Sequence, residues 1–453
     1  MTLQQKPRFQ RRSATVFGFV LGVGCTAAFT VALAAKKDGP YPRLDIFAKV
    51  LSHIENSYVE DVDDSKLVYG GIRGMVATID PHSAFMDPDE YRSMKDDTSG
   101  EFSGVGFEFA QRDGAMVVLG PIEDTPAANA GLLAGDIIVA INDVLTRGLS
   151  VTDATNRLKG KPGSEVRLRL MRPGVFNSPQ TITIKRAFIR VVAVDGKLLE
   201  GNIGYVRIKS FQQKTAADLK KKLAALRSET GVNFKGLVLD LRNNPGGLLD
   251  EGVATADRFL ETGIIVKTRD RNGRHVETET ATAVDNEPNY PIVVLINRGT
   301  ASASEIVAGA LQDQHRALLM GTTSFGKGSV QTIIDLDDGS ALKLTIARYY
   351  TPSGRSIQER GIVPDVLVSQ PAEDQDALLG ESTLPGHFKP DQNAPTPIIP
   401  VAGPAVLKSV NWDSEAPSDR QLAAATAALR DWPTFVANVK AQREAQGSNT
   451  AHP

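Results

Sequence analysis

The chain has 453 residues, a length that predicts two or three domains rather than one core. Its 51 basic and 53 acidic side chains leave a formal net charge of -2. This balance argues against a nucleic-acid partner, because phosphate-binding surfaces usually show a basic excess. The single cysteine, Cys25, excludes an intrachain disulfide and a cysteine-rich metal site, and we predict neither a metal nor a cofactor.

Residues 1–35 have the pattern of an export signal. Basic side chains precede an apolar run over about residues 14–35, and residues 32–34 (ALA) offer a small-x-small cleavage site. The run is also long enough to span a bilayer uncleaved, which would leave the rest of the chain outside the cytoplasm. We therefore expect an exported protein, either periplasmic or attached to the outer face of the inner membrane.

The next segments alternate between helical and polar patterns. Apolar residues recur at helical spacing from residue 45 to residue 80, which predicts two or three short helices. The polar stretch over residues 95–100 (KDDTSG) predicts a linker. A unit of short β-like runs, separated by glycine and proline turns, follows to about residue 190.

Three motifs in that unit resemble bacterial PDZ domains: residues 104–107 (GVGF), 125–132 (TPAANAGL) and 135–142 (GDIIVAIN). In such a loop, backbone N–H groups converge on a terminal carboxylate while the next strand pairs with an extended peptide. A helix near residues 151–158 would form the opposite wall. Glycines that only shape a hairpin are the alternative for the first motif taken alone. The predicted substrate-binding residues are Gly104, Val105, Gly106 and Phe107.

From residue 201 onward, apolar strands alternate with a helical pattern, which predicts an α/β core. The expected elements are strands at residues 203–208, 236–241 and 292–296 and a helix at residues 215–227. The prolines of residues 381–404 predict a flexible connector. A final amphipathic pattern after Asp419, a candidate cap, predicts one C-terminal helix that serves in dimerisation or in packing.

Ser302 lies in residues 297–305 (NRGTASASE), between the expected strand at residues 292–296 and a helical run at residues 306–311. A nucleophile at such a turn has its Oγ exposed, and the first N–H groups of the helix face developing negative charge. The alternative is that a hydroxyl of this cluster only caps the helix.

Lys327 lies in residues 321–331 (GTTSFGKGSVQ), which contain the G-x-x-x-x-G-K pattern of a phosphate-binding loop. Such a loop needs a Ser or Thr next and then a helix, whereas Gly328 and a predicted strand follow here. We therefore interpret Lys327 as a general base whose pKa must fall from about 10.4 through burial. Even spacing in a strand would put Gln331 on the same face, where it could hold the amine toward Ser302. A solvated surface lysine is the alternative.

Residues 240–249 (DLRNNPGGLL) run from a strand end through a glycine turn into a helix. Glycines let backbone N–H groups approach a substrate oxygen closely. One N–H of Gly246 or Gly247, together with that of Ala303, would complete an oxyanion hole. A plain turn is the alternative.

The order of these motifs over residues 43–368 resembles the C-terminal processing peptidases, also called tail-specific proteases. The resemblance implies a multidomain α+β chain, in which a PDZ-like domain precedes an α/β core of the ClpP/crotonase type, with helices at both ends. It also implies Ser302 as nucleophile, Lys327 as base and Gln331 as the residue that orients the lysine. Asp313 falls where some members carry a sensitive aspartate, and we expect a structural role for it here.

The expected function is that of a serine endopeptidase that cleaves proteins near their C-termini. Its partners would be proteins with accessible apolar tails, with an activating or adaptor protein, the membrane and a second copy of the chain as further candidates. The expected segments are a signal or anchor (1–35), a helical region (40–95), a PDZ domain (98–190), a protease core (191–370), a proline-rich linker (371–410) and a helical tail (411–453).

Two other functions stay open at this point. One is a Ser/His/Asp hydrolase that pairs Ser302 with His315 or His275, although neither histidine lies in a recognisable triad motif. The other is an inactive PDZ scaffold that only captures protein tails.

Overall fold

The computed structural model describes residues 41–112, 114–273, 275–370, 380–408, 410 and 419–449. They fall into two compact units divided after Gly74. The first unit contains helix α2 (Tyr41–Ser57) and most of helix α3 (Asp64–Ala77), as the helical spacing predicted. No helix in the described part of the chain is long and apolar enough to cross a membrane. The expected signal or anchor over residues 1–35 lies outside the described residues.

The linker predicted for residues 95–100 is wrong, because these residues end helix α4 (Pro88–Ser99). Asp87 caps this helix by accepting the N–H groups of Asp89 and Glu90, and the Glu90 carboxylate accepts the N–H of Asp87 in return. Gly100 ends the helix in the left-handed conformation, with φ 69°. These capping residues outweigh the polar composition on which the linker prediction rested.

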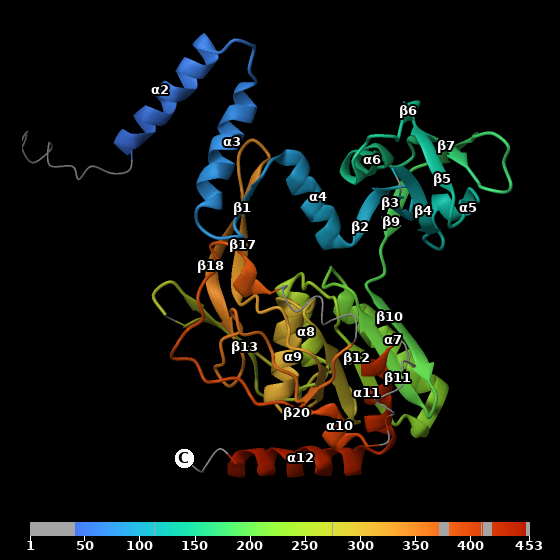
Figure 1. The fold of residues 1–453 in the computed structure, drawn as a ribbon, viewed down its shortest axis with the longest axis vertical. Coiled ribbons are helices and arrows are strands. Elements are labelled where there is room, and N and C mark those ends of the chain that lie inside the picture. Colours follow the sequence, from blue (N-terminus) through green and yellow to red (C-terminus); the bar gives the residue numbers. More distant parts are fainter. Residues whose placement is uncertain are drawn as a thin grey trace, which may run out of the picture. The chain divides into compact units, whose positions relative to one another are not determined.

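A small β unit follows α4, and Figure 1 shows its strands gathered with two short helices. Its sheet has the order β3-β4-β5-β7-β8, and β6 pairs with β5. Strands β2 (Glu101–Gly104) and β9 (Ala187–Arg190) pair antiparallel, which brings the two ends of the unit together. The remaining elements are β3 (Phe107–Arg112), β4 (Ala115–Pro121), α5 (Pro126–Asn129), β5 (Ile137–Ile141), β6 (Val144–Leu145), α6 (Val151–Leu158), β7 (Glu165–Met171) and β8 (Gln180–Lys185).

The main sheet has the order β10-β11-β12-β15-β16-β19-β20, and every pair from β11 onward is parallel. The central strands β12 (Gly236–Asp240) and β15 (Ile292–Ile296) are buried at every position, because a parallel sheet is covered on both faces. Their continuous apolar runs confirm the predicted α/β core. The flanking elements are β10 (Val194–Leu199), β11 (Ile203–Ile208), α7 (Thr215–Thr230), α8 (Leu249–Asp257), α9 (Ala303–Asp313) and β16 (Leu318–Gly321).

A second sheet has the order β1-β18-β13-β14, and strand β17 pairs with β18. Its members are β1 (Ala84–Met86), β13 (Ile264–Asp270), β14 (His275–Thr280), β17 (Ser329–Asp335) and β18 (Ala341–Tyr350). The β17–β18 register shifts between Val330 and Gln331, whose partners are Ala347 and Thr345. Ile346 is therefore the extra residue of a bulge, which lies close to the site described below.

Most of residues 381–404 form neither helix nor strand, as their prolines predicted, and the segment packs onto the core at several points. Strand β20 (Val401–Ala402) pairs parallel with β19 (Val366–Leu367) and extends the main sheet, and the short helix α10 (Gly403–Val406) follows. Glu381 is fully buried and hydrogen-bonds to His82 and Gln358. The prolines prevent long elements here, but the side chains dock the segment onto the core.

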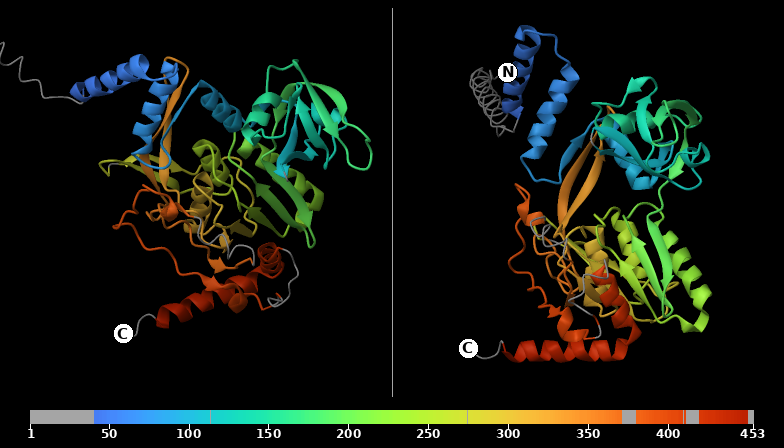
Figure 2. Two further views of the ribbon diagram at one scale, coloured as in Figure 1. Left: turned by 45° about the horizontal axis from the view of Figure 1, so that its top comes forward. Right: turned by 45° about the vertical axis from the view of Figure 1, so that its right-hand side comes forward.

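The C-terminal pattern forms two helices, not the single helix predicted. Asp419 caps α11 (Arg420–Arg430) by accepting the N–H of Leu422, as expected, and α12 (Trp432–Asn449) follows. Pro433, in the first turn of α12, cannot continue a preceding helix. The two helices, red in Figure 2, lie at a steep angle to one another. The buried face of α11 belongs to a core cluster with β12 and β15, so α11 is a packing helix.

Candidate active site

The glycine turn after β12 and the serine turn after β15 are far apart in the sequence, and hydrogen bonds join them. The side chain of Asn297 accepts the N–H of Asn243 and donates to the Asn243 side chain, both at 2.9 Å. The carbonyl oxygen of Asn244 accepts the N–H of Ala301 and the hydroxyl of Ser304, each at 3.0 Å. Since the carboxyl ends of parallel strands share one edge of a sheet, the glycine turn and the serine turn meet there.

Ser302 immediately precedes α9 and has a backbone conformation that L-residues rarely adopt, with φ 56° and ψ -118°. Such strain persists only where the surroundings impose it, and it occurs often at functional sites. The side chain is half-buried, whereas Ala301 and Ala303 on either side are buried. Ser302 is therefore accessible at this turn, as a nucleophile must be.

Glu305, which lies three residues after Ser302 in the first turn of α9, links the backbone of Ser302 to that of Lys327 through hydrogen bonds. Its Oε2 accepts the N–H of Ser302 at 2.8 Å and the N–H of Lys327 at 2.9 Å. Its Oε1 accepts the hydroxyl of Ser324 at 2.5 Å and the N–H of Gly326 at 2.7 Å. One buried carboxylate thus sets the spacing between the backbones of Ser302 and Lys327.

The chemistry of Glu305 depends on two opposing effects. Complete burial penalises the charged carboxylate and raises its pKa to about 7, although the four donors favour the ionised form. The N–H groups of Gly326 and Lys327 form the kind of anion-binding turn that a phosphate would occupy in a nucleotide-binding loop. Here the Glu305 carboxylate occupies this turn, and a strand rather than a helix follows it. These two features explain why the segment does not form a nucleotide-binding loop, as the sequence predicted.

The Lys327 amine is largely removed from solvent. Burial and, to a smaller extent, the nearby charge of Lys343 lower its pKa from 10.5 to about 8, against the opposing influence of Glu381, Glu305 and Asp80. The pKa of Lys343 is itself lowered by burial. A substantial fraction of Lys327 is therefore neutral at mildly alkaline pH, which suits a general base.

The even spacing expected between Lys327 and Gln331 falls only partly within a strand, because Lys327 precedes the first residue of β17. Gln331 Nε2 donates to Ser329 Oγ at 2.9 Å and to Thr345 Oγ1 at 3.3 Å. In the described part of the chain, no hydrogen bond joins Gln331 to Lys327, or Lys327 Nζ to Ser302 Oγ. Catalytic hydrogen bonds are often long in unliganded enzymes and tighten when substrate binds.

The glycine turn lies directly against the nucleophile. A Cβ on Gly246 would come within 2.8 Å of the Ser302 Cβ and 3.0 Å of the Ala303 nitrogen. The Gly246 N–H donates to the Asn244 side chain at 2.9 Å, so it is already engaged. No acceptor is bonded to the N–H groups of Gly247 and Ala303 within the described ranges. Of the three predicted oxyanion residues, these two retain donors for a substrate oxygen.

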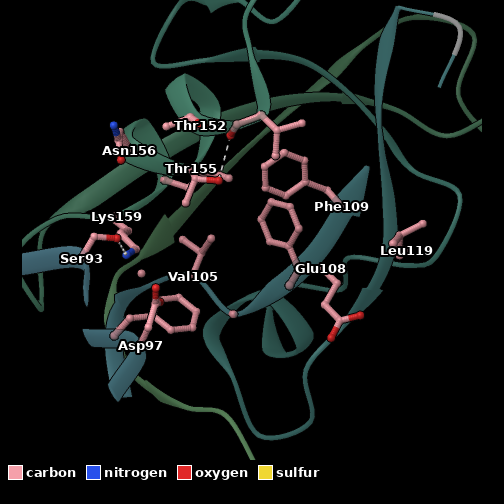
Figure 3. Close-up of a pocket in the computed structure, with 16 residues that line it drawn as sticks. Ser93, Asp97, Val105, Glu108, Phe109, Leu119, Thr152, Thr155, Asn156 and Lys159 are labelled. Atoms are coloured by element: carbon pink, nitrogen blue, oxygen red, sulfur yellow. Dashed lines mark hydrogen bonds between the residues drawn. The ribbon is translucent and has the colours of Figure 1, made fainter. Parts of the chain in front are cut away.

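The four predicted tail-binding residues line one groove of the small β unit, with a volume of about 620 Å³. Gly106 has φ 83°, and a Cβ there would meet Thr125 at 2.4 Å, so the loop requires glycine. Helix α6 forms the opposite wall, as predicted. Figure 3 shows Thr152, Thr155 and Asn156 of this helix across the groove from Val105.

The histidine alternatives gain no support from the geometry. Ser302 precedes the first residue of α9 and His315 follows its last turn, so the helix itself, roughly 16 Å long at 1.5 Å per residue, separates them. His275 belongs to β14 of the second sheet, and its side chain lies outside the described residues. Asp313 is paired with Arg355 and accepts the N–H and hydroxyl of Ser353, which fits the structural role expected for it.

Sequence reasoning missed the role of Glu305 and of the charges around Lys327. The Ser-x-x-Glu spacing of a capping box was visible and signals a carboxylate that returns to the Ser302 N–H. Asp80, Lys343 and Glu381 had no such signal, because they come from segments distant in sequence.

The chain matches three protein-family models. Residues 202–368 match peptidase family S41, residues 117–172 match a PDZ domain, and residues 30–90 match the N-terminal domain of the activating protease CtpB. The first two matches fall on the main sheet with its active-site candidates and on the small β unit.

Several named relatives are similar over most of their length. A carboxy-terminal-processing protease of Bartonella bacilliformis is 44% identical, over 84% of this chain and 89% of the relative. The carboxy-terminal processing protease CtpA of Bacillus subtilis is 36% identical, over 73% of this chain and 70% of the relative. A solved photosystem II D1 C-terminal processing protease is 34% identical, covering 76% of this chain and 92% of that chain, with a TM-score of 0.44. This chain therefore belongs to the carboxy-terminal processing proteases, PDZ-containing serine peptidases of family S41.

Proposed function

We propose that Ser302 is the nucleophile of this peptidase and that neutral Lys327 is its general base. The observation that carries the proposal is the shared carboxylate of Glu305, which binds the backbone N–H groups of both residues. The strained turn at Ser302 and the lowered pKa of Lys327 support the same assignment. Gln331 serves as a positioning residue that closes on the lysine when substrate is bound.

In the proposed reaction, the Lys327 amine takes the hydroxyl proton of Ser302 while Oγ attacks the scissile carbonyl carbon. The N–H groups of Gly247 and Ala303 stabilise the oxyanion of the tetrahedral intermediate. The lysine then gives its proton to the departing amine, and an acyl-serine remains. A water molecule, activated by the same lysine, hydrolyses this ester and restores the serine.

We further propose that the groove lined by Gly104, Val105, Gly106 and Phe107 binds the apolar C-terminal tail of the protein that is cleaved. A tail in extended conformation would add a strand beside β3, with its carboxylate at the glycine loop. The PDZ match and the groove between β3 and α6 support this proposal.

The expected segment boundaries and the export of the chain also remain proposals. The basic and apolar pattern of residues 1–35 supports export to the periplasm, with or without a retained anchor. The pairing of β2 with β9 supports a PDZ domain over residues 98–190. Mass spectrometry of the exported chain would measure whether residues 1–35 are removed.

The test compares cleavage of a model protein that ends in an apolar tail by the parent chain and two variants. Ser302→Ala should abolish cleavage, and Lys327→Ala should reduce kcat on the order of 1,000-fold, because general-base catalysis contributes about 10²–10⁴. Lys235→Ala, at an exposed lysine, is the matched control and should cleave normally. Near-parental cleavage by Lys327→Ala would remove the lysine from the mechanism.

A further inference from the structure

Glu108 occupies a distinctive position in the tail-binding groove. It lies on β3 between Phe107 and Phe109, whose ring centroids are 5.8 Å apart. Successive side chains of a strand point to opposite faces, so Glu108 projects away from the two rings. Figure 3 shows its carboxylate directed away from Phe109. The side chain is exposed, and no cation pairs with it within the described ranges.

The direction of a bound tail follows from the groove's two ends. The glycine loop precedes β3, and Lys159 follows the last residue of α6 at the same end of the groove. The Lys159 amine is held only loosely, 3.4 Å from Asp96 and 3.5 Å from Ser93. A terminal carboxylate therefore has backbone donors and a cation at this end, and the tail runs antiparallel to β3.

This direction fixes which tail residue meets which side chain. Directly opposed residues of an antiparallel pair place their side chains on the same face. With its carboxylate at the loop, the tail's last residue lies beside Phe107, and the third from the end lies beside Phe109. The penultimate residue then lies opposite Glu108, outside the apolar part of the groove.

We propose that Glu108 selects substrate tails whose penultimate residue is lysine or arginine. This inference rests on the proposed binding of tails in the groove, and it adds a second requirement to the apolar last residue. Leu119 lines the same groove and is 43% exposed. A long basic side chain can cover such an apolar surface with its stem while its charged end reaches the carboxylate. Aspartate or glutamate at the same position meets a like charge.

The experiment measures tail binding by the full chain carrying Ser302→Ala, so that peptides are not cleaved. Fluorescent ten-residue peptides, identical except for the penultimate residue, end in Lys-Val, Gln-Val or Glu-Val, and a fourth is the amidated Lys-Val peptide. Anisotropy should give the tightest binding for Lys-Val, about twofold to fivefold tighter than Gln-Val, as expected for one exposed ion pair. Glu-Val should bind most weakly, and high salt should reduce the differences.

Variants at the groove test the assignment to Glu108 itself. Glu108→Gln should remove the preference, and Glu108→Lys should invert it in favour of Glu-Val. Glu165→Gln, at an exposed position of β7, is the matched control and should keep the parental order. Exposure of Glu108 means that these changes leave the packed core of the unit intact.

Two negative results have different meanings. If amidation weakens binding but the three free-acid peptides bind equally, tails do bind in the groove and the role of Glu108 is refuted. If the amidated peptide binds as tightly as its free acid, carboxylate-directed tail binding fails, and the inference about Glu108 fails with it.

Discussion

The ionisation of Lys327 should control how activity depends on pH. With a pKa of about 8, about a tenth of the molecules carry a neutral amine at pH 7 and about nine-tenths at pH 9. A lysine at its ordinary pKa would be neutral in only about 3 molecules in 10,000 at pH 7, so the lowered pKa raises the competent fraction on the order of 300-fold. We expect kcat/KM, which reports the free enzyme, to rise between pH 7 and 9 with a midpoint near 8.

The substitution Lys343→Met tests whether the charge of Lys343 contributes to the lowered pKa of Lys327. The charge of Lys343 lowers the pKa of Lys327, so its removal should raise that pKa, move the midpoint to higher pH and reduce activity at pH 7. The assay is cleavage of a peptide substrate from pH 6 to 10, with thermal unfolding measured for each variant because Lys343 is partly buried.

Lys389→Met is the matched control, since Lys389 is 76% exposed and is not among the charges that shift the pKa of Lys327. It should retain the parental midpoint. A parental profile that is flat between pH 7 and 9 would refute the neutral lysine as base. If the folded Lys343→Met variant keeps the parental midpoint of activity against pH, the charge of Lys343 does not contribute to the lowered pKa of Lys327.

Glu305→Gln should lower kcat on the order of 100-fold in a steady-state assay, because an amide cannot accept all four donors and the two segments shift. Gly247→Ala should lower kcat at least 100-fold, because the added Cβ would meet the Phe211 carbonyl oxygen at 2.2 Å and displace an oxyanion donor. Gly201→Ala is the control and should not lower kcat in this way, because there is open space around Gly201. Lys327→Met should raise the free energy of unfolding at pH 7 by roughly 3 kcal/mol in denaturant unfolding, because the lowered pKa of Lys327 means that the folded state disfavours its charged amine. This gain in stability should fade above pH 8, as the amine of the parent becomes neutral in the folded state, and should vanish above about pH 10.5.

Much of the core could be predicted because its strands carry an unambiguous pattern. Ile292–Ile296 is a continuous apolar run of strand length, and Ile203–Ile208 is rich in β-forming residues; both form strands with those bounds. The helix Val151–Leu158 was expected from the resemblance to PDZ domains, and it forms with those bounds. The nucleophile turn followed from one such strand and the helix after it.

The failures came where capping and tertiary contacts outweighed composition. Residues 95–100 are polar, yet a capping box at Asp87 and the left-handed Gly100 make them the end of a helix. The proline-rich segment is docked through Glu381, whose partners lie far away in sequence. The bulge at Ile346 of β18 could not be located from the alternation of apolar residues alone.

In the proposed mechanism, Ser302 attacks the substrate after Lys327 takes its proton. The most direct measurement is rapid acid quenching of the reaction with an activated ester substrate, followed by mass spectrometric mapping of the acyl group. We predict an acyl group on Ser302 in the parent and a rate of acylation on the order of 1,000-fold lower in Lys327→Ala. An acyl group on any other residue, or an unchanged rate in Lys327→Ala, would contradict the claim.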